Sequence, residues 1–111
     1  MASKEYPLEP RQVARVETAH RRIVTPIPVP ESLPVLEAMR VAEPRSMRGQ
    51  APVLWAGGEG VHITDPYGNQ WLDFSSGVLV TSAGHGHPAI RDAIIDMATR
   101  GIHHAYCFPT D

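Results

Sequence analysis

The chain has 111 residues, a formal net charge of −2 and a single cysteine, Cys107. This length allows one small domain, and the scattered arginines form no dense basic block, so neither nucleic acid nor an anionic membrane is implied as a partner. One cysteine excludes an internal disulfide and fits a reducing compartment. No apolar run reaches the roughly 20 residues that span a bilayer, and no secretory signal begins the chain, so we expect a cytoplasmic location.

Glycine and proline divide the chain into two parts. All nine glycines lie at or after Gly49, whereas eight of the eleven prolines lie at or before Pro52. Proline-rich, glycine-free sequence favours helices joined by extended spacers, and glycine-rich sequence with aromatics favours strands and tight turns. We therefore predict a helical, proline-rich lead over residues 1–51 and a strand-containing part over residues 52–111.

Two helices are predicted in the lead. Pro10 is suited to the first turn of a helix, and apolar residues follow at near-helical spacing. The alternating prolines of residues 26–30 predict an extended spacer. Ser32 is predicted to cap a second short helix that ends before Pro44. The first helix would carry Val13, Val16, His20 and Ile23.

Three short antiparallel strands are predicted after the lead, over residues 53–56, 61–64 and 70–74. Asp65-Pro66-Tyr67-Gly68 is typical of a type I turn between the last two. The Gly57-Gly58-Glu59-Gly60 segment leads into a strand, so it predicts a hairpin loop and not a phosphate-binding loop. Asp73 is expected to face solvent or to bond with backbone.

A helix over residues 88–100 has the strongest local pattern in the chain. Pro88 suits its first turn, Asp96 and Arg100 form an i,i+4 pair, and Gly101 suits its end. Its apolar residues form one stripe at helical spacing. This stripe has too little partner surface within the chain, which also leaves open a non-catalytic dimerisation or interaction module. The stripe consists of Ile90, Ala93, Ile94, Met97 and Ala98.

His85 and His87 carry a second alternative, a metal-dependent hydrolase fragment. Their H-x-H spacing could offer two imidazoles to a divalent ion. A complete site would need further ligands, and the candidates are His103, His104 and Asp111. The simpler hypothesis is that His87 caps the helix at Pro88 while His85 bonds to backbone in the turn.

Residues 103–109 are dense in functional side-chain types and could line a pocket or form a connecting loop. Cys107 is not favoured as a nucleophile, because histidines adjacent in sequence do not establish a Cys–His pair.

Several motifs in linked order resemble the N-terminal part of the class III aminotransferases, which use pyridoxal phosphate (PLP). They are GVHITDPYGNQWLDFSSGVLV over residues 60–80 and GHGHPAIRDAI over residues 84–94. The resemblance covers residues 52–109 and does not select an amino donor. It implies an α+β fragment of a fold type I enzyme, with N-terminal helices, a small three-stranded antiparallel sheet and then an amphipathic helix that leads to the large domain.

The resemblance also implies a function. The parent enzyme would move an amino group from an amine or amino acid to a 2-oxo acid, as a homodimer with active sites at the subunit interface. Val78, Tyr106 and Cys107 match positions that shape the substrate pocket without acting as acid or base. The histidines of the Gly-His-x-His-Pro turn are not catalytic in the family.

Lys4 is the only lysine of the chain. PLP chemistry requires a Schiff-base lysine, and the family places this lysine, the acidic partner of the pyridine nitrogen and the phosphate-binding segment beyond the position of Asp111. We therefore expect an inactive N-terminal fragment in which the large PLP domain is absent and which contains no catalytic, cofactor-binding or metal-binding residue.

Overall fold

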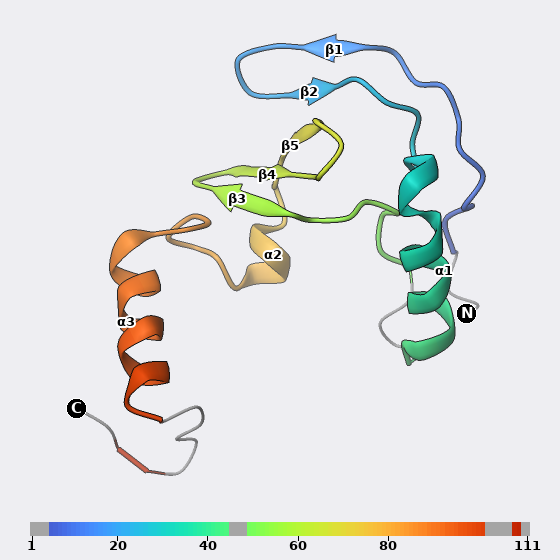
Figure 1. The fold of residues 1–111 in the computed structure, drawn as a ribbon. Helices are drawn as coiled ribbons and strands as arrows, with labels where there is room; N and C mark the ends of the chain where they lie inside the picture. Colours follow the sequence, from blue (N-terminus) through green and yellow to red (C-terminus); the bar gives the residue numbers. More distant parts are fainter. Residues whose placement is uncertain (1–4, 45–48, 102–107, 110–111) are drawn as a thin grey trace.

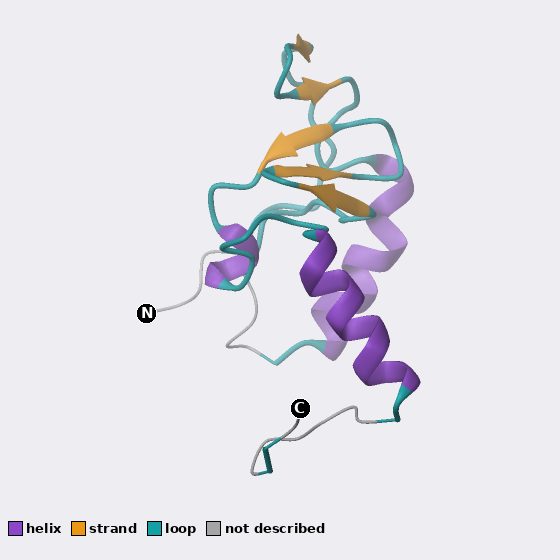
Figure 2. Cartoon of the chain, turned by 90° about the vertical axis from the view of Figure 1, so that its left-hand side faces the viewer, coloured by secondary structure: helices purple, strands orange, loops and turns teal. Residues whose placement is uncertain are grey.

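The computed structural model describes residues 5–44, 49–101 and 108–109, which form a small α+β unit (Figure 1). Its sheet is antiparallel, with the strand order β1-β2-β5-β4-β3. As drawn in Figures 1 and 2, the helices extend downward from the level of the lower strands of the sheet. The elements are β1 (Val16–Glu17), β2 (Arg22–Ile23), the 3-10 turn η1 (Pro30–Ser32), α1 (Leu33–Ala42), β3 (Gly57–Glu59), β4 (His62–Thr64), β5 (Gln70–Leu72), α2 (Ser76–Leu79) and α3 (Pro88–Thr99).

Among the described residues the sheet has five strands in place of the predicted three, because the lead contributes a hairpin. The helix predicted from Pro10 is wrong: β1 and β2 occupy its second half. The Arg21 backbone N–H donates to Thr18 Oγ1 at 2.9 Å and closes the hairpin. Arg22 then pairs with Gln70 of β5. Valine and isoleucine fit a strand at least as well as a helix, and pairing with a distant strand decided between the two.

The first hairpin of the second part lies further along the chain than predicted. Residues 53–56 form no strand, and β3 runs through the glycines that were expected to be a loop. Glycine is required at Gly58, because a Cβ there would lie 2.9 Å from both the Cδ1 atom of Ile63 and the Cβ atom of His85. The turn to β4 begins at Gly60, whose φ of +56° suits glycine.

The turn predicted from Asp65 is confirmed. The Asp65 carboxylate accepts hydrogen bonds from the Tyr67 N–H at 2.9 Å and the Asn69 N–H at 2.8 Å. Gly68 has a φ of +91°. This Asx-type bonding joins β4 to β5 and sets their register, with Ile63 opposite Trp71.

Asn69 connects this turn to the lead and is 1% exposed. Its Oδ1 accepts from the Val24 N–H at 2.8 Å. Its Nδ2 donates to Thr25 Oγ1 and to Asp65 Oδ2, each at 2.7 Å. A buried amide whose atoms are bonded in this way fixes β2 beside β5.

The second predicted helix is confirmed as α1, and Pro44 follows its end. Ser32 does not cap it, since its hydroxyl donates back to the Val29 carbonyl at 2.6 Å within the preceding 3-10 turn. Leu36 of α1 joins a small apolar core. The buried apolar side chains of the described residues are Ile23, Val29, Leu36 and Ile63.

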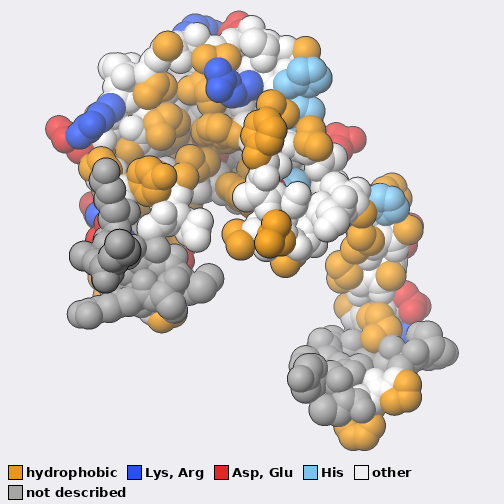
Figure 3. Space-filling model, turned by 180° about the vertical axis from the view of Figure 1, so that it is seen from behind, with side chains coloured by type: hydrophobic (Ala, Val, Ile, Leu, Met, Phe, Trp, Pro, Cys, Tyr) orange, Lys and Arg blue, Asp and Glu red, His pale blue; other side chains and the backbone are white. Residues whose placement is uncertain are grey.

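The predicted helix after Pro88 is confirmed as α3. Asp96 and Arg100 form the expected pair at 3.4 Å, and Gly101 follows with a φ of +76°. The helix extends away from the sheet (Figure 1). Its apolar side chains lie at the surface (Figure 3). Within the described residues, no helix is long and apolar enough to cross a membrane.

Candidate functional site

The segment after β5 forms a left-handed turn at α2. Ser76, Gly77, Val78 and Leu79 have φ values of +52°, +59°, +64° and +67°. The Leu79 N–H donates to the Ser75 carbonyl at 2.8 Å. Each L-residue in this conformation is disfavoured by roughly 1–2 kcal/mol, and a β-branched residue such as Val78 rarely adopts it. The turn is therefore strained, and strained backbone is concentrated at functional sites.

The Asp73 carboxylate lies before this turn and accepts four hydrogen bonds. They come from the Ser75 N–H at 2.9 Å, the Ser75 hydroxyl at 2.6 Å, the Gly77 N–H at 2.7 Å and His85 Nε2 at 2.7 Å. Only 5% of the Asp73 side chain is exposed. The bonds from the Ser75 hydroxyl and from His85 lower the pKa of Asp73 well below its usual range, because they stabilise the anion.

Asp73 had been expected to face solvent or to bond with backbone. The second of these alternatives is confirmed, because the carboxylate accepts from the backbone of Ser75 and Gly77, whereas the contact with His85 was not predicted. A local signal was present, since aspartate two residues before serine is typical of an Asx turn. The partner twelve residues away left no such signal.

His85 joins the turn to the edge of the sheet. Its backbone N–H donates to the Gly60 carbonyl at 2.8 Å, and the Gly60 N–H donates to the His85 carbonyl at 2.9 Å. Its ring lies edge-on to Trp55, with the ring centroids 5.7 Å apart. The prediction that His85 bonds to backbone is confirmed, and its imidazole has the additional role of binding Asp73.

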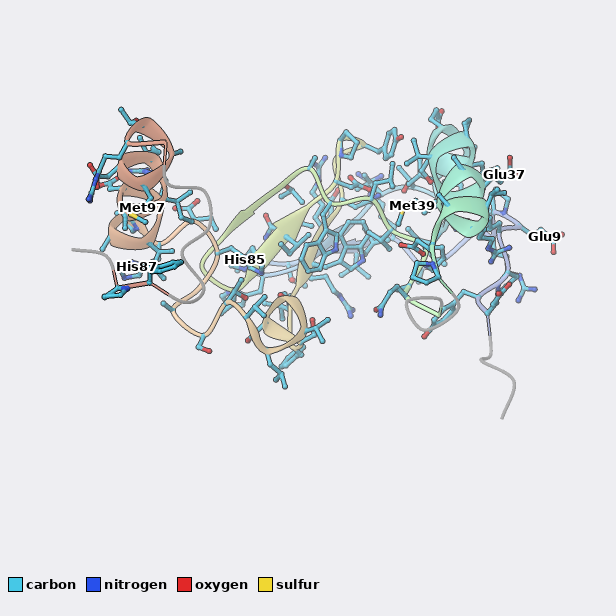
Figure 4. All side chains as sticks on the ribbon, turned by 90° about the horizontal axis from the view of Figure 1, so that it is seen from below. Glu9, Glu37, Met39, His85, His87 and Met97 are labelled. Carbon is cyan, nitrogen blue, oxygen red and sulfur yellow. The ribbon has the colours of Figure 1, made fainter. Side chains whose placement is uncertain are left out.

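The two histidines of the Gly-His-x-His-Pro turn serve different elements. Figure 4 shows His85 beside the sheet and His87 at the start of α3. His87 occupies the position before the helix, but its side chain makes no capping bond, so the predicted cap is wrong. In the described part of the chain, no group of three His, Cys, Asp or Glu side chains could hold a metal ion. His103, His104 and Asp111 lie outside the described residues.

Val78 is the only predicted pocket residue that the structure describes, since Tyr106 and Cys107 lie outside the described residues. Its side chain is 67% exposed. A shallow apolar groove separates the end of this turn from α3. It is lined by residues that include Val80, Thr81, Gly84, His87, Ile90 and Ile94.

The described residues do not fit a complete PLP site. PLP is held by a Schiff base with a lysine amine, and residues 5–44, 49–101 and 108–109 contain no lysine. Lys4 lies outside the described residues. The turn at α2 instead exposes the apolar side chains of Val78 and Leu79. The Asp73 carboxylate of this site already accepts four hydrogen bonds.

Comparison with known proteins gives a match to one family model and partial matches to individual relatives. The family model described as aminotransferase class-III matches residues 45–111. A probable mitochondrial acetylornithine aminotransferase from Schizosaccharomyces pombe is 38% identical over 63 residues, which are 57% of this chain and 14% of that protein. A succinylornithine transaminase from Salmonella paratyphi A is 40% identical over 53 residues, which are 48% of this chain and 13% of that protein. The chain thus matches about one-seventh of the length of these relatives.

Proposed function

The chain belongs to the class III aminotransferases, and on that premise we propose that it forms the pocket-shaping N-terminal part of a PLP-dependent transaminase of fold type I. The enzyme would transfer an amino group from an amine or amino acid to a 2-oxo acid. The observation that carries the proposal is the family match over residues 45–111. The names of the two relatives make ornithine derivatives the first amino donors to test.

In this proposal the cofactor chemistry belongs to another part of the enzyme. When bound, PLP supplies the electron sink for amino transfer, and a lysine must hold it. The described residues provide no such lysine, so we propose that residues 1–111 alone are inactive. Their contribution is to bind and orient the substrate.

Val78 is the residue of the described structure best placed for this contribution. It is apolar, largely exposed and carried by a strained turn that the neighbouring carboxylate holds. Tyr106 and Cys107 are proposed to line the same pocket, on the family resemblance alone. None of the three is proposed as an acid or base.

The apolar side chains of α3 support an assembly larger than the described chain. Ile90 and Ile94 of the apolar stripe are 49% and 63% exposed, and Ile95 beside the stripe is 56% exposed. A helix with such a stripe normally buries it against another layer. We propose that α3 packs on the large PLP domain, in an enzyme that is a cytoplasmic homodimer. Residues 1–51 would act as a lead whose hairpin extends the sheet beside β5.

The test compares the 111-residue chain with an intact aminotransferase that contains it. Both are mixed with PLP, an ornithine derivative and a 2-oxo acid. We expect stoichiometric PLP absorbance and amino transfer only from the intact enzyme. Turnover by residues 1–111 alone would refute the inactive-fragment proposal, and an intact enzyme that transfers no amino group would refute the transaminase proposal.

A further inference from the structure

We propose that Asp73 and His85 are positioning residues for the substrate pocket. They hold the turn Ser76–Leu79 in its left-handed conformation and so determine where Val78 presents its side chain. The inference deepens the proposed function and rests on it for the identity of the pocket. Neither residue is placed in contact with substrate.

The sequence of the turn does not by itself favour its conformation. Gly77 accepts a positive φ readily, but Ser76, Val78 and Leu79 do not. Such a backbone persists only where the surrounding structure determines it. The bonds made to the turn from outside are therefore decisive.

The Asp73 carboxylate supplies these bonds with both of its oxygens. Oδ1 accepts from the backbone and the hydroxyl of Ser75, which precedes the turn. Oδ2 accepts from the N–H of Gly77, inside the turn, and from His85 Nε2. One side chain thus fixes both the entry and the middle of the left-handed segment.

His85 relates this carboxylate to the sheet. Its backbone pairs with Gly60, and its Cβ lies so close to Gly58 that a side chain on that glycine would collide with it. The position of the turn is consequently set by β3 through the ring of His85, and not only by the loop that joins the turn to α3. The Gly-His-x-His-Pro motif therefore does more than connect the sheet to α3, because its first histidine also holds the turn.

The apolar side chains of the turn are exposed although its backbone is held by hydrogen bonds. Val78 and Leu79 are 67% and 85% exposed, so their side chains are available to a ligand while their backbone is held. If the Asp73–His85 pair were broken, the turn could relax toward ordinary φ values and Val78 would move. An apolar contact made equally in the ground state and the transition state affects KM and leaves kcat largely unchanged.

Two substitutions of His85 distinguish loss of the hydrogen bond to Asp73 from loss of the imidazole ring itself. The side-chain amide of His85→Gln reaches about as far as Nε2 and can still donate to Asp73, whereas the shorter amide of His85→Asn reaches only to the position of Nδ1. In the 111-residue chain, hydrogen exchange of the Gly77 amide is measured against the amides of β4. We expect His85→Asn to accelerate Gly77 exchange about 10-fold and His85→Gln to leave it near the wild-type rate.

The exposed Asp92→Asn variant on α3 serves as the control and should change nothing. Equal behaviour of the two His85 variants would overturn the proposal. Acceleration of β4 exchange to the same extent as Gly77 in His85→Asn would also overturn it, because His85 would then support the whole fold.

In the intact aminotransferase, His85→Asn should raise the KM for the amino donor roughly 10-fold with little change in kcat, and His85→Gln should restore it. A lowered kcat with an unchanged KM would overturn the positioning role. If the wild-type enzyme transfers no amino group, the proposed function fails, and the Gly77 exchange rates still decide whether the pair holds the turn.

Discussion

The junction between β2, β5 and β4 is fully packed within the described residues, whereas the apolar side chains of α3 are left mostly exposed by the described residues. At the junction, Ile63 is 3% exposed and Asn69 is 1% exposed with its amide fully engaged. On α3, Ile90 and Ile94 are 49% and 63% exposed. The difference teaches that a strong local pattern does not imply a finished contact. The helix has its stripe, and the surface that would cover it is not among the described residues.

The largest expected difference is between the two regions when isoleucine is replaced by alanine in each. Ile63→Ala should lower the free energy of unfolding by about 3 kcal/mol, because it removes buried methylenes and leaves a cavity. Ile94→Ala should change it by less than about 0.5 kcal/mol, because Ile94 is largely exposed and alanine favours a helix. Urea unfolding of the 111-residue chain followed by circular dichroism measures both. Equal losses would contradict the comparison.

Asn69→Ala should have the next largest effect, a loss of about 2–3 kcal/mol. It leaves the Val24 N–H and the groups around Asp65 without their buried partner. The exposed amide of Gln50 offers a matched control, and Gln50→Ala should be nearly neutral. The same unfolding measurement applies, and a neutral Asn69→Ala would show that β2 is held by other contacts.

Gly58→Ala tests the close approach between β3 and His85. The added methyl group would lie 2.9 Å from His85 Cβ, and we expect overpacking to lower stability by about 1–3 kcal/mol. At Gly60 a new Cβ meets nothing within 4 Å, so Gly60→Ala should incur only the penalty of a positive φ, about 1 kcal/mol. Thermal unfolding of both variants distinguishes these causes. A smaller loss at Gly58 than at Gly60 would argue against the contact.

The smallest expected effect is a local change in the turn around Asp73 when the pH is lowered. The pKa of Asp73 is lowered by folding, so its stabilising contribution is complete above the unfolded pKa of about 3.9 and is lost as pH falls below that value. The Gly77 amide resonance should therefore remain constant down to about pH 4 and shift only at lower pH. The shift should be absent in Asp73→Asn. A midpoint at the ordinary aspartate pKa in the wild-type chain would show that Asp73 is not held as described.

Local signals predicted the elements whose contacts are close in sequence. Pro88 to Gly101 indicated α3, and Asp65 to Gly68 indicated the turn between β4 and β5, and both are confirmed. Val78 is a proposed pocket residue on family resemblance alone, and no local pattern predicted its left-handed backbone. The contacts that hold it come from Asp73 and His85, which no short pattern connects.

The sequence by itself determined the family of this protein, because the order of its motifs along residues 52–109 is a property of the sequence alone. It also determined the amphipathic α3 and the Asx turn, because each depends on residues a few positions apart. Only the tertiary structure decided that Val16 and Ile23 of the lead pair in a hairpin and that residues 76–79 turn left-handed. The physical reason is that both outcomes depend on hydrogen bonds between distant residues. Val24 to Asn69 spans 45 positions and Asp73 to His85 spans 12, and such partners override weak local preferences.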